Sequence, residues 1–553
     1  MKRKWLVGIL AIVMTAAFVT ACSGTDDGGS GGGNSNSSEI SSAEIVDGSS
    51  SGENSSFVED NSSETVDSNS EEISSEESTE NEYPEDYYTE GLAFTLQDDD
   101  TYAVTDYTGT ATKVVIPSIY SGKAVTVISG MAFFRCGILA EIVIPNSVTR
   151  IAPFLFCQSL TNITVQKNNP EYISIDGNLY SKDGKNLIQY AIGKTATSFT
   201  ISNGVTCVEP GAFFGCERLE KIVIPDGVTS IGDAAFRYCS NLTTIVIPDS
   251  VTSISDEETF DGCNNLQYTV KDELKYLGNP SNPYIYLAGT ETTDITSATI
   301  ESTCKFIGEY AFYDCDSLTE IVIPDSVTSV GDEVFCSCSN LTKIVIPDSI
   351  TTMGEAEFEG CYNLQYTIKD GLKYLGNPNN PYMYLADTET MDITSATIEN
   401  GCKFIGYETF AWREGLTKII IPDSVTNIDS RVFFECSCLT NITVGENNTK
   451  YTSIDGNLYS KDGKTLMQYA IGKTATWFTI PGNVTSIGED AFRGCSSLTE
   501  IVIPDSVMSI GGGAFYNCDN LTIYCEAESQ PIGWEDWDES DSPIVVVWGY
   551  KGE

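Results

Sequence analysis

The sequence has no histidine, and that absence excludes several classes of chemistry. Among its 553 residues no imidazole is present to serve a Ser-His-Asp or Cys-His catalytic arrangement, or a zinc site that needs histidine ligands. Basic residues are scarce, since 30 Lys and Arg stand against 79 Asp and Glu and the formal net charge is -49. A nucleic-acid partner would need clustered Lys and Arg, and a bound nucleotide would call for a glycine-rich phosphate loop that the sequence lacks. We therefore expect no nucleic acid and no cofactor.

The first residues have the composition of a lipoprotein signal peptide. Lys2, Arg3 and Lys4 precede an apolar run that is too short to span a bilayer comfortably, and this run ends in VTAC at Cys22. This order is typical of a bacterial lipobox, whose cysteine receives the lipid. Residues 1–22 are thus predicted to be the signal peptide and Cys22 the lipidation site, which places the chain at the extracellular face of the cell membrane. An ordinary signal peptide or an uncleaved anchor is the alternative.

Residues 23–86 are predicted to form a disordered acidic tether. They consist mainly of Ser, Gly, Asn, Glu and Asp, hold 18 carboxylates and contain no Lys or Arg. Such a segment cannot bury enough apolar surface to offset its ordering entropy, and its like charges extend it. We interpret it as a spacer for the folded part, with an acidic interaction tail as the alternative.

The rest of the chain repeats a unit of 23 residues. Its apolar positions follow the pattern L-x-x-I-x-I-P-x-x-V-x-x-I-G-x-x-x-F-x-x-C. The first part predicts a short strand, and the segment around the phenylalanine predicts a single 3₁₀ or α turn. Because no unit can bury its apolar face alone, about twelve units are expected to stack into a solenoid with parallel strands. The proline of the unit recurs 23 residues apart at Pro225 and Pro248, Pro324 and Pro347, and Pro481 and Pro504.

The repeated pattern LxxIxIPxxVxxIGxxAFxxCxxL resembles the BspA-like, treponemal type of leucine-rich repeat, from about Thr105 to Tyr524. The resemblance implies a curved, right-handed solenoid, here of the α/β class, in a surface protein that binds or adheres to host or bacterial surface proteins. A glycan-capturing surface lipoprotein and a non-binding envelope spacer are the alternatives. No enzyme is expected, because nearly every acid lies in a repeated turn and no unique constellation stands out. Residues 87–524 are assigned to the solenoid with its N-terminal cap, and the tryptophan-containing residues 525–553 to a C-terminal cap.

Four inserts of two kinds interrupt the array, at about 164–199, 267–297, 366–396 and 443–478. The first and last inserts contain Asp183-Gly184 and Asp462-Gly463, which predict type I′ hairpin turns. The D-x-N spacing of Asp176 and Asn178 hints at calcium. The other ligand positions of a calcium loop are missing, however, and turn formation is the better interpretation.

The two middle inserts are rich in tyrosine and are nearly identical to each other. Tyrosine beside Asn and Asp suits contact with an extracellular protein or glycan, so these rings are the candidate ligand-binding residues. The favoured alternative is that the rings pack on the neighbouring repeat and cover the hairpin. The residues are Tyr276, Tyr284 and Tyr286 in one insert and Tyr374, Tyr382 and Tyr384 in the other.

Cysteine recurs once per unit, and four functions were considered for it. A metal needs ligands that converge, and one ligand per layer does not converge. Disulfides pair two residues, yet the register contains a run of three, and Arg413 fills the same place in one unit. A row of nucleophiles would need an activating base. We therefore predict small buried side chains in the core, with no metal and no catalytic residue. The register cysteines are Cys136, Cys157, Cys216, Cys239, Cys263, Cys315, Cys338, Cys361, Cys436, Cys495 and Cys518.

Six further cysteines lie off this register. Disulfides among them stay open as a prediction, because the expected compartment lies outside the cell. They are Cys207, Cys304, Cys336, Cys402, Cys438 and Cys525.

Overall fold

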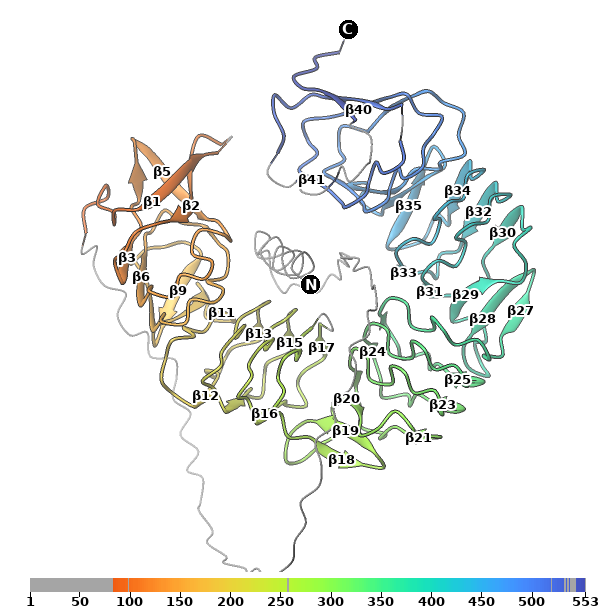
Figure 1. Ribbon diagram of the computed structural model, residues 1–553, viewed down its shortest axis with the longest axis horizontal. Coiled ribbons are helices and arrows are strands. Elements are labelled where there is room, and N and C mark those ends of the chain that lie inside the picture. Colours follow the sequence, from red (N-terminus) through yellow and green to blue (C-terminus); the bar gives the residue numbers. More distant parts are fainter. Residues whose placement is uncertain are drawn as a thin grey trace, which may run out of the picture.

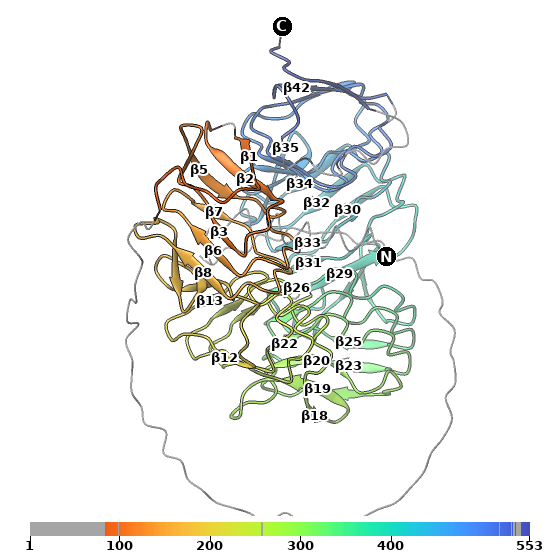
Figure 2. The same cartoon turned by 60° about the vertical axis from the view of Figure 1, so that its left-hand side comes forward.

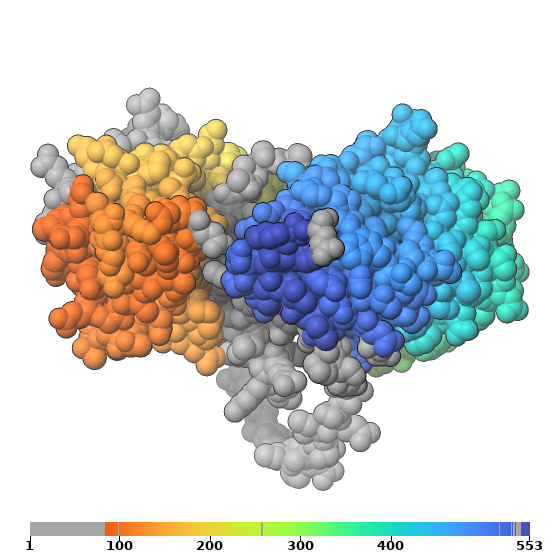
Figure 3. Space-filling view, turned by 90° about the horizontal axis from the view of Figure 1, so that it is seen from above, coloured from red at the N-terminus to blue at the C-terminus, as the bar shows by residue number. Residues whose placement is uncertain are grey.

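The computed structural model describes residues 83–97, 99–255, 258–518, 520–531, 534, 537 and 544–552. The predicted signal peptide, Cys22 and residues 23–82 of the predicted tether lie outside the described residues. Stacked units form an open arc, and the first and last units are its two ends (Figures 1, 2 and 3). In the described ranges no helix is long and apolar enough to cross a membrane.

Short parallel strands line the outer side of the arc (Figure 1). Successive strands pair in register one repeat apart, as Ile222 does with Ile245, because each unit places the same isoleucine inward. The outer sheets are β3 (Lys113–Val115), β6 (Glu141–Ile144) and β8 (Asn162–Val165); β12 (Ser198–Thr200), β14 (Lys221–Val223) and β16 (Thr244–Val246); β21 (Ala298–Thr299), β23 (Glu320–Val322) and β25 (Lys343–Val345); β30 (Ser395–Thr397), β32 (Lys418–Ile421) and β34 (Asn441–Val444); and β38 (Trp477–Thr479), β40 (Glu500–Ile503), β42 (Thr522–Cys525) and β43 (Val545–Val547).

A second row of two-residue strands lines the inner side (Figure 1). These strands contain the apolar residue that follows the second turn of the unit, such as Ile231 in β15, so units within one sheet are held to each other on both sides of the core. They are β7 (Arg150–Ile151), β13 (Cys207–Val208), β15 (Ser230–Ile231), β17 (Ser253–Ile254), β22 (Phe306–Ile307), β24 (Ser329–Val330), β26 (Thr352–Met353), β31 (Phe404–Ile405), β33 (Asn427–Ile428), β39 (Ser486–Ile487) and β41 (Ser509–Ile510).

The four inserts form antiparallel strands that join the inner sheets. In the first insert the tight two-residue turn falls at Asp176–Gly177, where both φ angles are positive, at 49° and 68°. The prediction of a type I′ turn at Asp183–Gly184 is wrong, because only Gly184 has a positive φ there. The strands are β9 (Tyr172–Ile175), β10 (Asn178–Ser181) and β11 (Asn186–Gln189); β18 (Thr269–Lys271), β19 (Leu274–Leu277) and β20 (Tyr286–Thr290); β27 (Thr367–Lys369), β28 (Leu372–Leu375) and β29 (Tyr384–Thr388); and β35 (Tyr451–Ile454), β36 (Asn457–Ser460) and β37 (Thr465–Gln468).

Each unit crosses from its inner strand to the next outer strand through a turn segment, which ends at the register cysteine. The predicted α or 3₁₀ turns, and with them the α/β class, are not confirmed, since the described residues contain no helix. In the unit of Cys239 the residues five and one before the cysteine, Ala234 and Tyr238, have φ of 48° and 58°. A left-handed residue at two positions of one short segment interrupts helical hydrogen bonding. The fold is therefore a β-solenoid of the leucine-rich-repeat type.

The turn segments form a backbone ladder of their own. Their N–H groups donate to carbonyls of the following unit, as from Gly211 to Asp233, Phe213 to Ala235 and Gly215 to Arg237, at 2.9, 2.8 and 2.8 Å. The left-handed residues turn these N–H groups toward the next unit instead of along a helix. The same direction recurs along the arc, for example from Trp412 to Phe434 at 2.9 Å.

A stack of aromatic rings runs through the core behind the turn segments. In the middle of the arc Phe312, Phe335 and Phe358 stack with ring centroids 5.5 and 5.7 Å apart and nearly parallel planes. Similar stacks lie at Phe213, Phe236 and Phe260, at Phe410 and Phe433, and at Phe492 and Phe515.

Distinct segments cover the two ends of the core. At the N-terminal end the strands are β1 (Leu92–Leu96), β2 (Tyr102–Tyr107), β4 (Ile119–Tyr120) and β5 (Lys123–Ile128). At the other end β43 pairs in parallel with β42, and Trp534 and Trp537 are buried against the last unit. Trp537 meets Phe515 edge to face at 5.9 Å, which closes the last aromatic stack.

Candidate functional site around Trp412

The six candidate tyrosines differ in exposure. Tyr276 and Tyr374 are buried, and their hydroxyl oxygens accept the N–H groups of Glu301 and Glu399 at 3.3 and 3.1 Å. Burial raises the pKa of both phenols above the ordinary value. These two rings hold the hairpins to the next outer strand and are not exposed to a ligand.

Tyr286 and Tyr384 end the aromatic stacks that precede them. Tyr286 meets Phe260 at 5.1 Å, and Tyr384 meets Phe358 at 5.1 Å, both edge to face. Both tyrosines are buried. The packing interpretation therefore accounts for four of the six candidate rings.

Tyr284 and Tyr382 are half-buried, each edge-on to the buried tyrosine of its own hairpin at 5.3 Å. Lys271 lies 5.3 Å from the centroid of the Tyr284 ring. A ligand contact by the tyrosine inserts depends on these two rings.

The register cysteines are buried except for the half-buried Cys136, and several of them donate a hydrogen bond to the preceding unit. The thiol of Cys239 lies 3.1 Å from the carbonyl oxygen of Phe213 in the preceding unit, and Cys263, Cys338 and Cys436 repeat this contact with the carbonyls of Phe236, Phe312 and Phe410 at 3.0, 3.1 and 3.0 Å. Burial raises the pKa of the Cys436 thiol to about 12, so it stays protonated. The predicted core position is confirmed for the buried register cysteines. Their thiols also donate hydrogen bonds to carbonyl oxygens, which the sequence pattern did not predict. Sixteen described cysteines are free thiols, including the off-register Cys304, Cys336, Cys402, Cys438 and Cys525.

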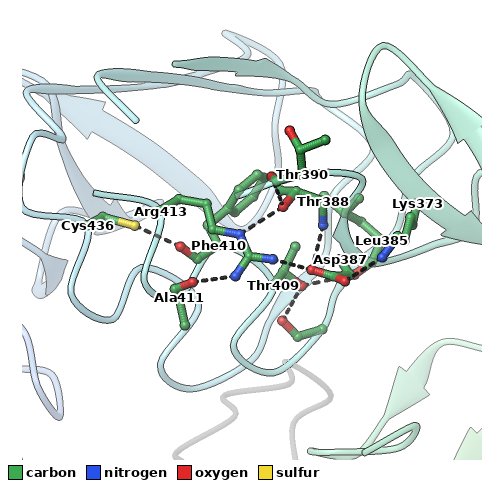
Figure 4. Close-up of polar contacts among 11 residues, drawn as sticks. Lys373, Leu385, Asp387, Thr388, Thr390, Thr409, Phe410, Ala411, Arg413 and Cys436 are labelled. Atoms are coloured by element: carbon green, nitrogen blue, oxygen red, sulfur yellow. Dashed lines mark hydrogen bonds and ion pairs between the residues drawn. The ribbon is translucent and has the colours of Figure 1, made fainter. Parts of the chain in front are cut away.

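One unit replaces the register cysteine with a buried arginine. Arg413 is only 8% exposed and points into the core (Figure 4). Its Nε donates to Thr388 Oγ1 at 2.8 Å, its Nη1 to the carbonyl oxygen of Ala411, and its Nη2 to Asp387. Asp387 also pairs with Lys373 at 2.8 Å. The guanidinium therefore joins the turn segment of its unit to the preceding tyrosine hairpin.

The residue next to Arg413 projects outward from the same turn. Trp412 has a left-handed backbone, with φ 63°, and its side chain is 53% exposed. Its indole meets Phe434 edge to face at 5.1 Å. A large aromatic ring held by a fixed backbone at the surface is a common anchor for a protein partner.

Two arginines extend this aromatic surface across the following units. Arg493 lies between two rings, 4.7 Å from the centroid of Phe434 and 4.4 Å from that of Tyr516. Arg431 lies 5.9 Å from Phe434. Asp490 fixes the group, with Arg493 at 3.0 Å and Arg431 at 3.6 Å. We call the Trp412 cluster the set Trp412, Arg431, Phe434, Arg493 and Tyr516.

A related row lies on the turn segments near the N-terminal end, at one or two residues before the register cysteine. Phe134, Phe156, Phe214 and Tyr238 meet edge to face at 5.7, 5.1 and 5.4 Å. Arg135 lies 5.2 Å from Phe134, and the guanidinium of Arg237 lies 4.7 Å from the ring of Tyr238. Aromatic rings with arginine are thus a recurrent feature of the turn-segment side, best exposed at Trp412.

One feature of the sequence indicates this site. The segment FAWREGL places Arg413 where the register otherwise has cysteine, which is a departure from the repeat. The neighbouring tryptophan was not singled out, because its exposure depends on the left-handed turn. Arg493 and Tyr516 lie on units beyond the last insert. The contact of Arg493 with Phe434 therefore depends on how the units stack in space and cannot be predicted from the sequence of one unit.

Buried carboxylates mark the places where the tyrosine inserts interrupt the ladder of turn segments. Glu309 Oε2 accepts the N–H of Glu258 at 3.2 Å across the first interruption, in place of a backbone carbonyl. Burial, with a smaller contribution from Asp332, raises the pKa of Glu309 to about 8. At the second interruption Ser430 donates to Glu355 at 3.0 Å, and burial raises the pKa of Asp429 well above its ordinary range.

These acids predict that the protein is more stable at mildly acidic pH than at alkaline pH. A carboxyl whose pKa is higher in the folded state stabilises that state fully below the unfolded pKa of about 4.5, and the contribution is lost as the pH rises through the folded value, which is about 8 for Glu309. We expect the thermal unfolding midpoint to fall by several degrees between pH 5 and pH 9. Glu309→Gln should reduce this fall.

The control for that measurement is Glu217→Gln, which removes one carboxyl at an exposed position. Calorimetry of both variants across the pH range separates the contribution of the buried Glu309 carboxyl to the unfolding midpoint from the contribution of general charge repulsion in an acidic protein. Equal slopes in both variants and the parent would contradict the assignment to Glu309.

The fold and the surface cluster define a leucine-rich-repeat solenoid, a scaffold typical of non-enzymatic repeat proteins. The chain matches the family described as BspA type Leucine rich repeat region, over residues 110–192, 189–281, 289–378, 388–466 and 468–533. It therefore belongs to that family, as the resemblance implied. The comparison with curated proteins gives no match.

Several solved structures are similar to the chain. A leucine rich cell surface protein from Faecalibacterium prausnitzii A2-165 is 24% identical, over 81% of this chain and 96% of that chain, with a TM-score of 0.25. A leucine-rich repeat protein from Bacteroides ovatus is 21% identical over 83% and 100%, with a TM-score of 0.23. The leucine rich repeat protein of T. pallidum is 21% identical over 51% and 91%, with a TM-score of 0.20.

Proposed function

We propose that this protein is a bacterial surface protein that binds an extracellular protein partner through the Trp412 cluster. The observation that carries the proposal is the exposed indole of Trp412 beside Phe434, with Arg493 held between Phe434 and Tyr516. Tryptophan, tyrosine and arginine are the residues most enriched among energetically dominant interface contacts. Family membership supports a surface location.

The proposal includes anchoring by lipid at Cys22, with residues 23–82 of the predicted tether as the spacer that carries the solenoid away from the membrane. Support for the anchor comes from the order of basic residues, apolar run and VTAC in the sequence. Tyr284 and Tyr382 are proposed as secondary contacts, since they keep part of their rings at the surface. A glycan ligand or a non-binding spacer remains the alternative.

Trp412→Ala is expected to weaken capture of the protein partner about tenfold or more, because it removes the exposed anchor of the cluster. The measurement is a pull-down of matrix and bacterial surface proteins with the chain lacking its first 22 residues, followed by titration of each captured protein. Trp477→Ala is the matched control, since Trp477 is also exposed, at 45%, but lies on the outer strand β38 away from the arginines.

Equal losses in both variants, or none in Trp412→Ala, would exclude the cluster as the binding site. Binding of polysaccharides with no protein captured would favour the glycan alternative. Absence of any ligand across both panels would favour the spacer.

A further inference from the structure

A polar hollow lies on the outer side of the first sheet, apart from the Trp412 cluster. It has a volume of about 240 Å³ and is lined by Tyr83 and by side chains of β3, β6 and β8. The segment after Tyr83 is fixed along β3, since the Thr89 N–H donates to the Val115 carbonyl at 3.1 Å and the Val115 N–H donates to Thr89 Oγ1 at 2.9 Å. Tyr83 is thereby placed at the rim of the hollow, with its ring stacked on Tyr87 at 5.2 Å.

The charges in the hollow cancel each other. Lys113 Nζ pairs with Glu141 Oε1 at 3.0 Å and lies 5.8 Å from the centroid of the Tyr83 ring. The pKa of Lys113 is raised chiefly by its hydrogen bond with Glu141. A charged ligand would meet no uncompensated partner here, whereas a hydroxyl group can donate to the carboxylate and accept from the ammonium.

Gln166 lines the hollow and has a side-chain oxygen that can still accept a hydrogen bond. Its side chain is 6% exposed, and its Oε1 has no hydrogen-bond partner among the described residues. Asn162 stands beside it and donates to Thr164 Oγ1 at 3.0 Å, which leaves a second amide hydrogen. Buried amide oxygens are nearly always paired, so one that borders a hollow indicates a ligand group that would supply the donor.

The fold itself does not require this glutamine. The outer strands β32 and β34 repeat the arrangement of β6 and β8, with Asn441 and Thr443 in the places of Asn162 and Thr164. There Gly445 stands in the place of Gln166. The same sheet is therefore built without the amide, so the side-chain amide of Gln166 is not required to form it.

We propose that this hollow binds one neutral sugar ring of an extracellular glycan. Tyr83 offers an aromatic ring at the rim, and the amides of Asn162 and Gln166, with the Lys113–Glu141 pair, offer donors and acceptors for neighbouring hydroxyl groups. The volume lies below the range typical of drug-sized ligands and suits a single ring. The proposal is independent of the Trp412 cluster, so the failure of either leaves the other standing.

The test is ligand-observed NMR with the full-length chain and a panel of methyl glycosides, of which galactose, glucose, mannose and N-acetylglucosamine are neutral and glucuronic acid is charged. We expect at least one neutral glycoside to bind with a Kd on the order of 1 mM. Gln166→Ala and Tyr83→Ala should each weaken it about tenfold, and Asn441→Ala on the equivalent sheet should leave it unchanged. Circular dichroism of each variant shows whether the solenoid is intact.

Three outcomes would overturn the proposal. One is the absence of neutral glycoside binding at about ten times that Kd. Another is binding that survives in both Gln166→Ala and Tyr83→Ala while the variants stay folded. The third is binding of glucuronic acid alone, which would assign the hollow to charged ligands.

Discussion

Replacing Arg413 with alanine is expected to lower the free energy of unfolding by about 2–3 kcal/mol. The substitution leaves Asp387 without the guanidinium and leaves Thr388 Oγ1 without the Nε donor. Asp387 keeps only its ion pair with Lys373, and the empty volume left in the core adds to the cost of the lost hydrogen bonds. The measurement is chemical denaturation, read from the shift of the midpoint, with hydrogen exchange to locate the loss near residues 373–436.

The chain itself supplies the control for Arg413. The first tyrosine insert has Gly289 where the second has Asp387, and the unit that follows it has Cys315 where the other has Arg413. The double substitution Asp387→Gly with Arg413→Cys copies that solution and should recover most of the lost stability. A double variant as unstable as Arg413→Ala would show that the two residues are not coupled.

Phe335→Ala should destabilise the middle of the arc by about 3–5 kcal/mol, the usual range for a large aromatic ring removed from a core. Phe335 is fully buried and lies between Phe312 and Phe358, so its loss removes two ring contacts and leaves a cavity at the centre of a stack. Because each unit contacts mainly its neighbours, the loss should be greatest in those units and fade along the array. Hydrogen exchange along the chain measures that gradient.

Two further variants serve as controls for the stability loss expected in Phe335→Ala. Phe335→Leu keeps most of the volume and should lose less than half as much stability. Tyr362→Ala, at a side chain that is 87% exposed in a nearby unit, should change stability by no more than about 0.5 kcal/mol. A loss spread evenly over the whole arc in Phe335→Ala would contradict the picture of neighbour-limited stability.

The strands were predictable because their pattern is local. The spacing of Ile245 and Ile247 before Pro248 fixes which side chains face inward, and repetition at 23 residues fixes the register between units. The hairpin inserts were predictable for the same reason. The turn segments were not, since Tyr238 and Trp412 take left-handed conformations that only some units signal by glycine, as at Gly215 and Gly262.

The candidate site was less predictable because burial is not local. Tyr276 and Tyr286 are buried where a hairpin meets the next strand and an aromatic stack ends, as the favoured packing interpretation expects, but the pattern within the insert does not distinguish them from the half-buried Tyr284. Asp387 lies 26 residues before Arg413 in the sequence. Their contact depends on the hairpin folding back onto the following unit, and no spacing rule for a single unit contains that information.

The ladder of turn segments gives the whole arc a chemical polarity. Its N–H groups all face the following unit, so an uncovered first unit would present carbonyl oxygens and an uncovered last unit would present amide hydrogens. Two such arcs can extend one another head to tail, but joining like ends would set donor against donor or acceptor against acceptor. At the first gap the acceptor comes from the downstream side, where Glu309 supplies it, whereas at the second gap the downstream Ser430 donates to Glu355. The acidic residue at the first interruption is thus a consequence of the direction in which the repeats are stacked.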